Sequence, residues 1–408
     1  MAEPTIAVAG GGLAGAKTAE ALRAEGFTGR IVVVGAEAHA PYERPPLSKG
    51  YLQGNAERDS VLVHPPQWYD DNAVELRLGS PVTAVDTGSH EITTADGYRL
   101  GWDTLVLATG SRPRLLPLPD ADPAGVAYLR DLGDSDRLRA GFRTDARVVV
   151  IGGGWIGLET AAAAVTAGAH VTVVESAELP LLRVLGPQPA RVFADLHVER
   201  GVDLRLGRSV ASVTATGSGG NAVVLDDGSE LAADLVLVGI GAVPNVEPAR
   251  DAGLSVDDGI LVDEHLRTSH PDVLAVGDIA NAWHPFYGRR LRVEHWANAL
   301  NQPAVAARSA LGLDAVYDRL PYFYTDQYDL GMEYTGHADP RSTEVVVRGD
   351  LAGREFIAFW LDGGRVVAGM NVNVWDVTGP IGALIRSEAQ VSADRLADPG
   401  VALEDLAG

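Results

Sequence analysis

Two glycine-rich segments carry the residue pattern that holds the pyrophosphate of a dinucleotide. Residues 10–15 read GGGLAG after the apolar run 6–9, and residues 152–157 read GGGWIG after the apolar run 148–151. In a strand–turn–helix unit the first glycine makes the turn, the second lets the backbone approach the pyrophosphate, and the third lets the helix pack on the strand. The helix N-terminus adds free N–H groups and the positive end of the helix dipole. The pattern predicts two bound dinucleotides, between which electrons can pass.

A carboxylate follows each glycine motif at the offset of a ribose-binding acid. Glu37 and Glu175 each stand about 20 residues after the last glycine of the motif, at the end of the next predicted strand. A carboxylate at Glu175 accepts a hydrogen bond from the 2′-hydroxyl of NADH but repels the 2′-phosphate of NADPH. Arg183 is the nearest cation and could offset that repulsion. The sequence therefore favours NADH as the donor.

The composition excludes several classes of partner and of redox site. The chain has 408 residues, a formal net charge of −22 and no cysteine, so it holds no disulfide, thiolate metal site or iron–sulfur cluster. Its ten histidines show no metal-ligand spacing, and no metal is expected. The negative charge argues against nucleic acid and anionic membranes as partners. No apolar run reaches the ~18 residues of a spanning helix, and the N-terminal run lacks the basic flank of a signal peptide. We expect a cytoplasmic protein.

Alternating strand-like and helix-like segments predict an α/β fold with two Rossmann-like domains and a C-terminal α+β domain. A proline-rich linker over residues 112–123 marks the first boundary, a second unit starts near residue 124, and the chain returns to the first domain with a strand over 273–278. Helices are expected over residues 16–25, 158–167, 187–200 and 296–311. Strands are expected over residues 31–35, 82–86, 90–94, 104–108, 171–174, 235–239, 343–347, 355–361 and 365–370.

Several short motifs together resemble one family over nearly the whole chain. They are RPPLSK at 44–49, ATG at 108–110, AVGD at 275–278, EHW at 294–296 and DQYD at 326–329. With both glycine motifs, they resemble the FAD-dependent NADH:ferredoxin reductases of oxygenase systems, of the putidaredoxin reductase and biphenyl dioxygenase ferredoxin reductase type. These belong to the pyridine nucleotide-disulfide oxidoreductase superfamily, with a glutathione-reductase-like fold. The PPLSK and DQYD segments are the narrower motifs and carry the assignment to this type.

The resemblance implies a role for each domain and a set of FAD-binding residues. An FAD domain over 1–112 and 244–320 would enclose an inserted NAD domain over 113–243, with a C-terminal interface domain over 321–408. The Asp278 carboxylate would bind the flavin ribitol; its alternative role is a helix N-cap. The helix that starts at Trp296 would point its N-terminus at the flavin pyrimidine and stabilise negative charge there. The implied FAD site is Gly10, Gly12, Ala14, Gly15, Glu37, Arg44, Lys49, Val82, Thr109, Gly110, Arg130, Asp278, Glu294, His295 and Trp296.

The resemblance also implies an NAD site, next to which the two candidate catalytic residues, Lys49 and Glu159, come together. Its members are Gly152, Gly154, Ile156, Gly157, Glu159, Glu175, Gly239 and Gly241. By resemblance, Lys49 lies beside the flavin N5 edge and pairs with Glu159, and the nicotinamide meets N5 over this pair. From the residues alone, Lys49 could be a solvated lysine, and Glu159 a carboxylate in the first turn of a helix, favoured by the helix dipole.

The absence of cysteine leaves an external electron acceptor. The resemblance implies a [2Fe–2S] ferredoxin that serves a haem monooxygenase or a ring-hydroxylating dioxygenase. The alternatives are an NADH oxidase or diaphorase that uses oxygen or quinone, and a redox sensor resembling apoptosis-inducing factor. The densest basic run, Arg289, Arg290 and Arg292, is the candidate docking site for an acidic ferredoxin. Its alternative role is a solvated hairpin tip.

Two aromatic residues bear on the path by which electrons leave the flavin. Family members commonly carry tryptophan where this chain has Tyr324, so an aromatic ring remains to cover the flavin. Trp375 is a second candidate near the docking face and could equally belong to the core.

Overall fold

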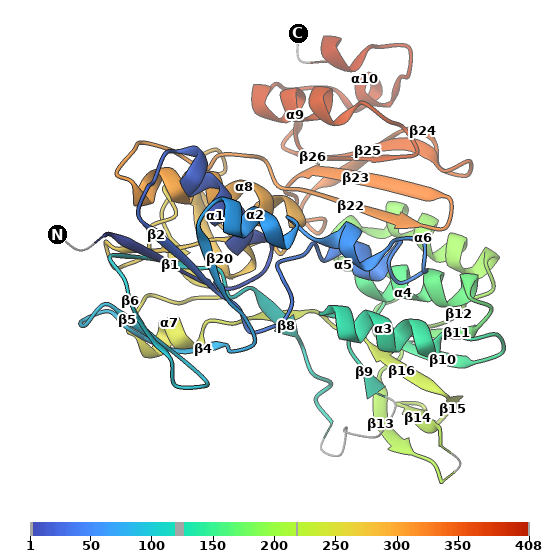
Figure 1. Ribbon diagram of the computed structural model, residues 1–408. Coiled ribbons are helices and arrows are strands. Elements are labelled where there is room, and N and C mark those ends of the chain that lie inside the picture. Colours follow the sequence, from blue (N-terminus) through green and yellow to red (C-terminus); the bar gives the residue numbers. More distant parts are fainter. Residues whose placement is uncertain (1–2, 119–125, 218, 407–408) are drawn as a thin grey trace. The chain divides into compact units, whose positions relative to one another are not determined.

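The chain forms two compact units, each assembled from separated segments (Figure 1). The structure is a computed structural model that describes residues 3–118, 126–217 and 219–406. Unit 1 comprises Met1–Arg44, Glu57–Arg112 and Ala242–Pro321; unit 2 comprises Pro45–Ala56, Pro113–Gly241 and Tyr322–Gly408. The end of the predicted linker, residues 119–123, and the predicted start near residue 124 lie outside the described residues. The four-part division into domains stays a prediction.

Unit 1 is built on a five-stranded parallel sheet with the order β19-β7-β1-β2-β3. Its strands read as apolar runs, and Val32 and Val33 are fully buried, as parallel strands covered on both faces require. Helices α1 (Leu13–Ala24) and α8 (Trp296–Ala310) pack side by side (Figure 1). In sheet order the strands are β19 (Val273–Ala275), β7 (Thr104–Leu107), β1 (Thr5–Ala9), β2 (Arg30–Val34) and β3 (Val74–Arg77).

Short sheets and helices complete unit 1. A hairpin sheet has the order β4-β5-β6, another has the order β18-β20-β21, and β8 pairs with β17. The elements are β4 (Val82–Asp86), β5 (Glu91–Thr94), β6 (Arg99–Gly101), β8 (Ser111–Pro113), β17 (Ala242–Pro244), β18 (Ile260–Val262), β20 (Ala280–His284), β21 (Arg289–Leu291), α2 (Pro66–Asp71), α7 (Glu247–Asp251), η2 (Arg58–Val61) and η3 (Gly277–Ile279).

Unit 2 repeats the Rossmann-like arrangement. A five-stranded parallel sheet has the order β12-β11-β10-β16-β9, and a three-stranded antiparallel sheet has the order β13-β14-β15. The helix α3 begins with a capping box between Asp131 and Asp134. The elements are η1 (Pro45–Ser48), β9 (Val126–Ala127), α3 (Leu132–Gly141), β10 (Arg147–Ile151), α4 (Trp155–Thr166), β11 (His170–Glu175), α5 (Leu182–Leu185), α6 (Pro187–Glu199), β12 (Asp203–Leu206), β13 (Val210–Ala215), β14 (Asn221–Leu225), β15 (Glu230–Ala233) and β16 (Leu235–Val238).

The C-terminal part of unit 2 is an antiparallel sheet that shares a core with the helices of the second Rossmann-like sheet. Its five strands have the order β22-β23-β26-β25-β24. Phe356 and Trp360 of this sheet join Leu158 of α4 and Phe193 of α6 in one apolar cluster. The elements are β22 (Tyr322–Gln327), β23 (Leu330–Gly336), β24 (Glu344–Asp350), β25 (Glu355–Asp362), β26 (Arg365–Val372), α9 (Thr378–Ser387), α10 (Ala393–Ala397) and η4 (Leu403–Asp405).

The predicted fold class is confirmed, but several predicted bounds are wrong. The helices predicted to begin at residues 16 and 158 begin at Leu13 and Trp155, because Gly12 and Gly154 are their N-cap residues. The strand predicted over 273–278 ends at Ala275, because Gly277 has a φ of +77° that breaks the extended chain. In the part of the chain described, no helix is both long and apolar enough to cross a membrane.

Candidate active site

The first glycine turn has two glycines that sterics require and one that is open. Gly10 has a φ of +135°, and a β-carbon added there would lie 2.0 Å from the Ala108 carbonyl oxygen. A β-carbon at Gly15 would lie 1.9 Å from the Gly10 oxygen, so the helix can approach the strand only with glycine there. At Gly12 an added β-carbon would have no described atom within 4 Å. The N-terminus of α1 therefore faces an open cradle that fits a pyrophosphate.

The second turn repeats this geometry in unit 2. Gly152 has a φ of +104°, and its added β-carbon would lie 2.4 Å from the Gly239 oxygen; that of Gly157 would lie 2.0 Å from the Gly152 oxygen. Gly154 again has no described atom within 4 Å of an added β-carbon. Gly241, with a φ of +107°, follows β16 beyond Gly239. Among the predicted NAD residues, Ile156 is exposed. The structure thus brings the predicted glycines together around one cradle at the start of α4.

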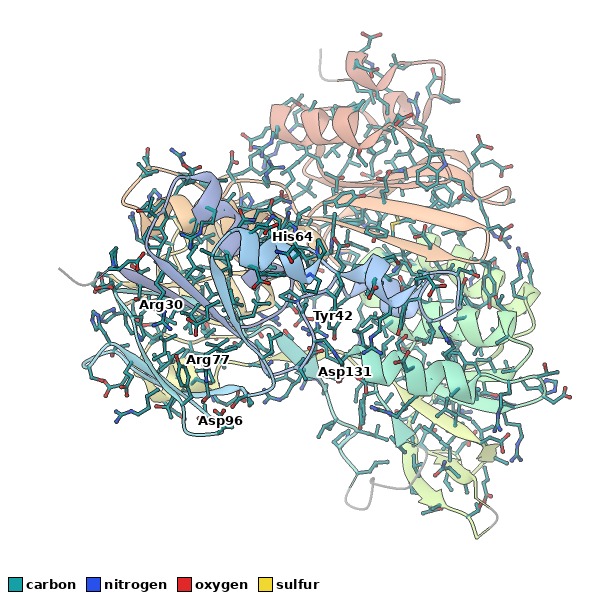
Figure 2. The ribbon with its side chains drawn as sticks, in the orientation of Figure 1. Arg30, Tyr42, His64, Arg77, Asp96 and Asp131 are labelled. Carbon is teal, nitrogen blue, oxygen red and sulfur yellow. The ribbon has the colours of Figure 1, made fainter. Side chains whose placement is uncertain are left out.

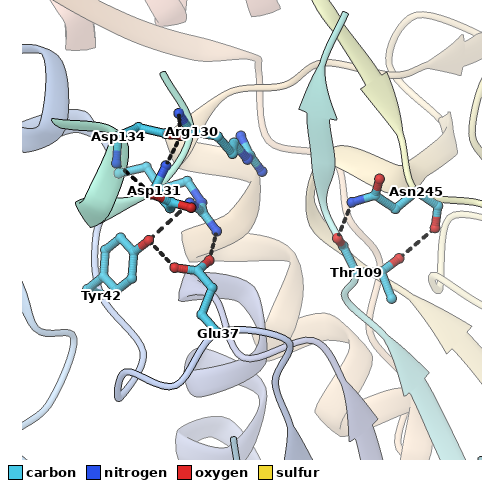
Figure 3. Close-up of polar contacts among 8 residues, drawn as sticks. Glu37, Tyr42, Thr109, Arg130, Asp131, Asp134 and Asn245 are labelled. Atoms are coloured by element: carbon cyan, nitrogen blue, oxygen red, sulfur yellow. Dashed lines mark hydrogen bonds and ion pairs between the residues drawn. The ribbon is translucent and has the colours of Figure 1, made fainter. Parts of the chain in front are cut away.

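The acid after the first turn belongs to a compact polar group. Glu37 accepts hydrogen bonds from Arg44 Nη2 at 2.7 Å and from the Tyr42 hydroxyl (Figure 3). Burial by itself would lower the pKa of the Arg44 guanidinium, but interactions with Tyr42, Glu37 and Asp278 outweigh burial and raise it. An ionised carboxylate has about four lone-pair sites, so Glu37 keeps acceptor capacity for a ribose hydroxyl. Tyr42 was not among the predicted site residues; its place between Pro41 and Arg44 gave no distinguishing signal.

The acid after the second turn is held by the backbone. Glu175 Oε2 accepts from the Gly153 N–H at 2.7 Å, and its Oε1 accepts from the Ala177 N–H at 2.7 Å. These bonds fix the carboxylate at the end of β11, directly beside the glycine turn. Within the described residues, no ion pair joins Arg183 to Glu175. The negative charge that would repel a 2′-phosphate is therefore not neutralised by that arginine.

Two predicted FAD residues have structural partners of their own. The Thr109 hydroxyl donates to the Asn245 carbonyl oxygen at 2.8 Å, and the Asn245 side-chain amide donates to the backbone carbonyl oxygen of Thr109 at 2.9 Å (Figure 3). Gly110 accepts from the Asn245 N–H and has a φ of +63°. These hydrogen bonds join the segment that leaves unit 1 after Arg112 to the segment that returns to it at Ala242.

The other predicted FAD residues lie on both units. In unit 1, Val82 starts β4, Glu294 is exposed, and His295 is the N-cap residue of α8, which begins at Trp296. Asp278 lies inside η3, whose N-cap residue is Val276, so the alternative role of Asp278 as a helix N-cap is wrong. In unit 2, the Arg130 N–H donates to Asp134 at 2.8 Å.

A cavity of about 250 Å³ lies at the carboxyl ends of β2 and β3. Ligands of open α/β sheets bind outside the carboxyl ends of the strands, at the point where the strand order reverses. In this sheet that point lies between β1 and β7, so the cavity is at the ligand-binding edge but on the β2–β3 side of the reversal. Arg77 and Asp96, which sequence reasoning did not single out, are labelled in Figure 2. The residues that line the cavity are Val34, Leu76, Arg77, Leu78, Ser80, Thr94 and Asp96.

Lys49 and Glu159 form a buried ion pair in unit 2. Lys49 Nζ lies 2.8 Å from Glu159 Oε1, with side-chain exposures of 15% and 3%. The ammonium also lies 5.3 Å from the centroid of the Tyr324 ring, within cation–π range. The alternative of a solvated Lys49 is therefore wrong. The alternative of a first-turn carboxylate is also wrong, because α4 begins at Trp155 and has no acidic residue in its first turn.

Further polar residues lie on and behind Glu159; Ser48 and Gln327 were noted only as parts of the RPPLSK and DQYD motifs, and Thr325 and His197 were given no role. Ser48 donates to Glu159 Oε2, and Thr325 donates to Glu159 Oε1. Behind Thr325, Gln327 Nε2 donates to its hydroxyl oxygen at 3.2 Å, and His197 of α6 bonds the Gln327 side chain at 2.9 Å. The only available signal was that Thr325 and Gln327, two apart on one strand, face the same side. Burial lowers the pKa of His197 to about 4, although its bond to Gln327 opposes the shift.

The basic run lies on and just after the hairpin strand β21, and its three arginines differ in their exposure and in their partners. Arg292 pairs with Asp258 at 3.0 Å and with Glu294, and its side chain is 13% exposed. Arg289 and Arg290 are exposed, and Arg290 donates to the Val262 oxygen at 2.6 Å. Trp283 stands opposite Arg290 in the β20–β21 pairing and is 39% exposed. We call Trp283, Arg289 and Arg290 the hairpin patch.

Trp375, the second aromatic candidate, lies on the surface of unit 2. Trp375 is 55% exposed, so its alternative role as a core residue is wrong. Its ring covers Gly331, where an added β-carbon would lie 2.5 Å from a ring atom.

Ligand atoms of His90, His270 and Asp272 lie within 4.8 Å of one another, a set that could hold a metal ion. Histidine spacing did not reveal it, because His90 and His270 are distant in sequence.

Comparison with known proteins gives matches along the whole chain. Residues 4–303 match the family described as pyridine nucleotide-disulphide oxidoreductase, and residues 322–407 match the reductase C-terminal family. Putidaredoxin reductase of Pseudomonas putida is 39% identical over 412 residues, covering 99% of this chain and 97% of that protein. The ferredoxin–NAD(+) reductase component of the anthranilate 1,2-dioxygenase system of Burkholderia cepacia is 41% identical over 406 residues, covering 99% of each. The crystal structure of the covalent putidaredoxin reductase–putidaredoxin complex matches with a TM-score of 0.95 and 38% identity, covering 100% of this chain and 98% of that chain.

The open glycines give a test of both cradles. Gly12→Val and Gly154→Val place side chains where no described atom stands within 4 Å, at extended φ values, so both variants should fold. We expect the added atoms to occupy the position of the phosphates. Gly12→Val should therefore purify without FAD, and Gly154→Val should keep FAD but bind NADH at least roughly tenfold more weakly. FAD absorbance and NADH titration measure this. Gly217→Val, also in open space, is the control, and unchanged binding in both test variants would contradict the assignment.

The depressed pKa of His197 predicts acid sensitivity. Since the folded protein holds this ring neutral to about pH 4 and the unfolded chain protonates it near 6.5, stability is full above pH 6.5 and falls as the pH drops from 6.5 towards 4. Between pH 7 and pH 5 the free energy of unfolding should fall by about 2 kcal/mol more in the parent than in His197→Gln. Urea unfolding at both pH values measures the difference. Equal losses in the two proteins would show that His197 titrates normally.

Proposed function

The chain belongs to the pyridine nucleotide-disulphide oxidoreductase family, and from that premise we propose that it passes electrons from NADH through FAD to a [2Fe–2S] ferredoxin that serves an oxygenase. The family resemblance read from the sequence is confirmed, as are the predicted oxidoreductase class and the use of FAD and NAD(H). The relatives named as reductase components of dioxygenase systems, and the structure of a reductase with its putidaredoxin, support the ferredoxin and the oxygenase.

The observation that carries the proposal is a pair of dinucleotide cradles in a chain without cysteine. Relatives in the wider family that reduce disulfides need a cysteine pair next to the flavin, and this chain offers none. Electrons that reach the flavin must therefore leave to a separate acceptor. FAD, when bound, would supply electrons one at a time, which suits an iron–sulfur carrier.

The residues around each cradle divide the work of binding. In unit 1 the α1 cradle, Glu37 and Asp278 would hold the pyrophosphate, adenosine ribose and ribitol of FAD. In unit 2 the α4 cradle and Glu175 would hold NADH, and the fixed negative charge of Glu175 favours NADH over NADPH. FAD, when bound, accepts a hydride from the nicotinamide, so the task of the protein is orientation and exclusion of water.

Lys49 and Glu159 are proposed to orient the reacting rings. The pair is buried and rigid, since Glu159 receives three hydrogen bonds and the ammonium faces the Tyr324 ring. Such a fixed charge pair gives the nicotinamide a defined surface to slide over.

We also propose that the protein works in the cytoplasm, where NADH is available. The four predicted domains remain the division of the chain that we propose.

A cytochrome c assay tests the function as a whole. NADH-driven cytochrome c reduction should depend strictly on an added [2Fe–2S] ferredoxin, because the chain has no cysteine relay of its own. Replacing NADH with NADPH should lower kcat/KM by roughly tenfold or more, through repulsion at Glu175. Fast oxygen consumption without ferredoxin would instead identify an oxidase, and a preference for NADPH would overturn the assigned role of Glu175.

Rapid mixing with NADH tests the ion pair. Lys49→Ala and Glu159→Ala should each slow flavin reduction by on the order of tenfold or more, because the nicotinamide loses its fixed surface. Lys17→Ala, at the only other lysine of the chain, should leave the rate unchanged. Reduction at the parent rate in both test variants would refute the role of the pair.

Charge reversal tests the hairpin patch. Arg289→Glu combined with Arg290→Glu should lower kcat/KM for ferredoxin by roughly tenfold at low salt, because exposed charges steer association. Direct reduction of ferricyanide should stay within about twofold, since a small dye needs no docking surface. Arg143→Glu combined with Arg191→Glu, at two exposed arginines of unit 2, matches the change in net charge and is the control. An equal loss in both assays would rule out docking at the patch.

A further inference from the structure

We propose that His197 and Gln327 are positioning residues for hydride transfer, which hold the Glu159 carboxylate in place through the Thr325 hydroxyl. The inference rests on the proposed role of Lys49 and Glu159 and extends it to two residues remote from the ion pair. No motif in the sequence marks His197, and Gln327 was noted only as part of the DQYD segment.

Four consecutive side chains form one buried hydrogen-bonded line inside unit 2. Glu159 of α4 accepts from Thr325 of β22, whose oxygen accepts from Gln327 Nε2 at 3.2 Å. Gln327 Oε1 then lies 2.9 Å from His197 Nε2 on α6. Their exposures are 3%, 1%, 1% and 0% from Glu159 to His197. Water has little access to any of these groups, so each must be satisfied by its neighbour in the line.

The ionised carboxylate imposes one direction on all the hydrogens of the line. A carboxylate only accepts, so the Thr325 hydrogen must point at Glu159, and the Thr325 oxygen must accept from the amide of Gln327. The Gln327 carbonyl oxygen then faces His197, which must donate from Nε2. The neutral ring carries a single N–H, so Nδ1 must be bare. Among the described residues Nδ1 is indeed a buried nitrogen without a hydrogen-bond partner.

The far end of the line is anchored by packing and by charge. The His197 ring lies 5.3 Å from the Tyr328 ring, and Arg200, one turn along the chain, lies 5.2 Å from the same ring. Arg200 also pairs with Asp329, which ties the C-terminal end of α6 to the turn between β22 and β23. The His197 donor therefore stands at a fixed place relative to Gln327.

Loss of the Gln327 amide would release Thr325. Without a donor behind it, the Thr325 hydroxyl could rotate away from Glu159, and Oε1 would keep only Lys49 as its partner. The carboxylate and the ammonium would then shift together, and the surface offered to the nicotinamide would lose its definition. A displacement of this kind lowers the rate of hydride transfer more than the affinity for NADH.

The test uses the FAD-loaded protein and matched variants along the line. Gln327→Met and His197→Phe keep side-chain volume but remove the bonds, whereas His197→Gln keeps an N–H donor. In rapid mixing, Gln327→Met and His197→Phe should lower the limiting rate of flavin reduction about fivefold, the equivalent of one neutral hydrogen bond. The Kd for NADH should stay within about twofold, and His197→Gln should restore most of the rate.

The outcomes separate this inference from the proposed function. Slow reduction in Lys49→Ala with the parent rate in Gln327→Met and His197→Phe overturns the positioning role and leaves the proposed function intact. Lower thermal stability with an unchanged limiting rate would mean that the line is only structural, and overturns it too. If His197→Phe does not fold, Gln327→Met carries the test alone, because it removes the donor behind the Thr325 hydroxyl and leaves Thr325 itself in place.

Discussion

The ion pair between Lys49 and Glu159 is the interaction on which unit 2 depends. Taking a carboxylate and an ammonium out of water costs several kcal/mol for each ion, and the attraction between them offsets this only when further hydrogen bonds complete the site. Here Ser48 and Thr325 supply those bonds, one from the segment after Arg44 and one from β22. Three remote stretches of chain must therefore come together before the charges can be buried. The pair is a folding constraint as well as the centre of the proposed active site.

The shared core shows how the C-terminal sheet meets this constraint. Thr325 can reach Glu159 only if β22 is held against α4, and the cluster of Leu158, Phe193, Phe356 and Trp360 holds it there. A C-terminal sheet joined to its neighbour by a flexible linker could not keep a buried carboxylate satisfied. The sequence suggested a separate domain from residue 321 because the strands become shorter and the turns richer in glycine. That change marks a new sheet topology, yet the apolar core continues across it.

Local patterns predicted the parts of this structure that depend on local rules. The glycine turns, the parallel strands and the acids after them follow from steric and dipole requirements within about 40 residues of chain. The partnership of Lys49 with Glu159 came only through resemblance, because a lysine after a proline-rich turn has no local mark of its partner. Tyr42, Thr325 and His197 could not be found at all, since their importance arises from contacts between distant segments. His90, His270 and Asp272 converge for the same reason.

The absence of cysteine and the distribution of charge together shape the exit of electrons. A net charge of −22 repels an acidic carrier at long range, so docking cannot rely on the field of the whole protein. Salt screens that repulsion beyond a Debye length of about 8 Å at physiological ionic strength, and inside this distance local charges decide. On the hairpin, Arg292 pairs with Asp258 and Glu294, whereas the side chains of Arg289 and Arg290 are exposed beside an exposed tryptophan. A small cationic and aromatic patch on an acidic protein favours brief, orientation-specific encounters, which suit a carrier that must leave after each electron.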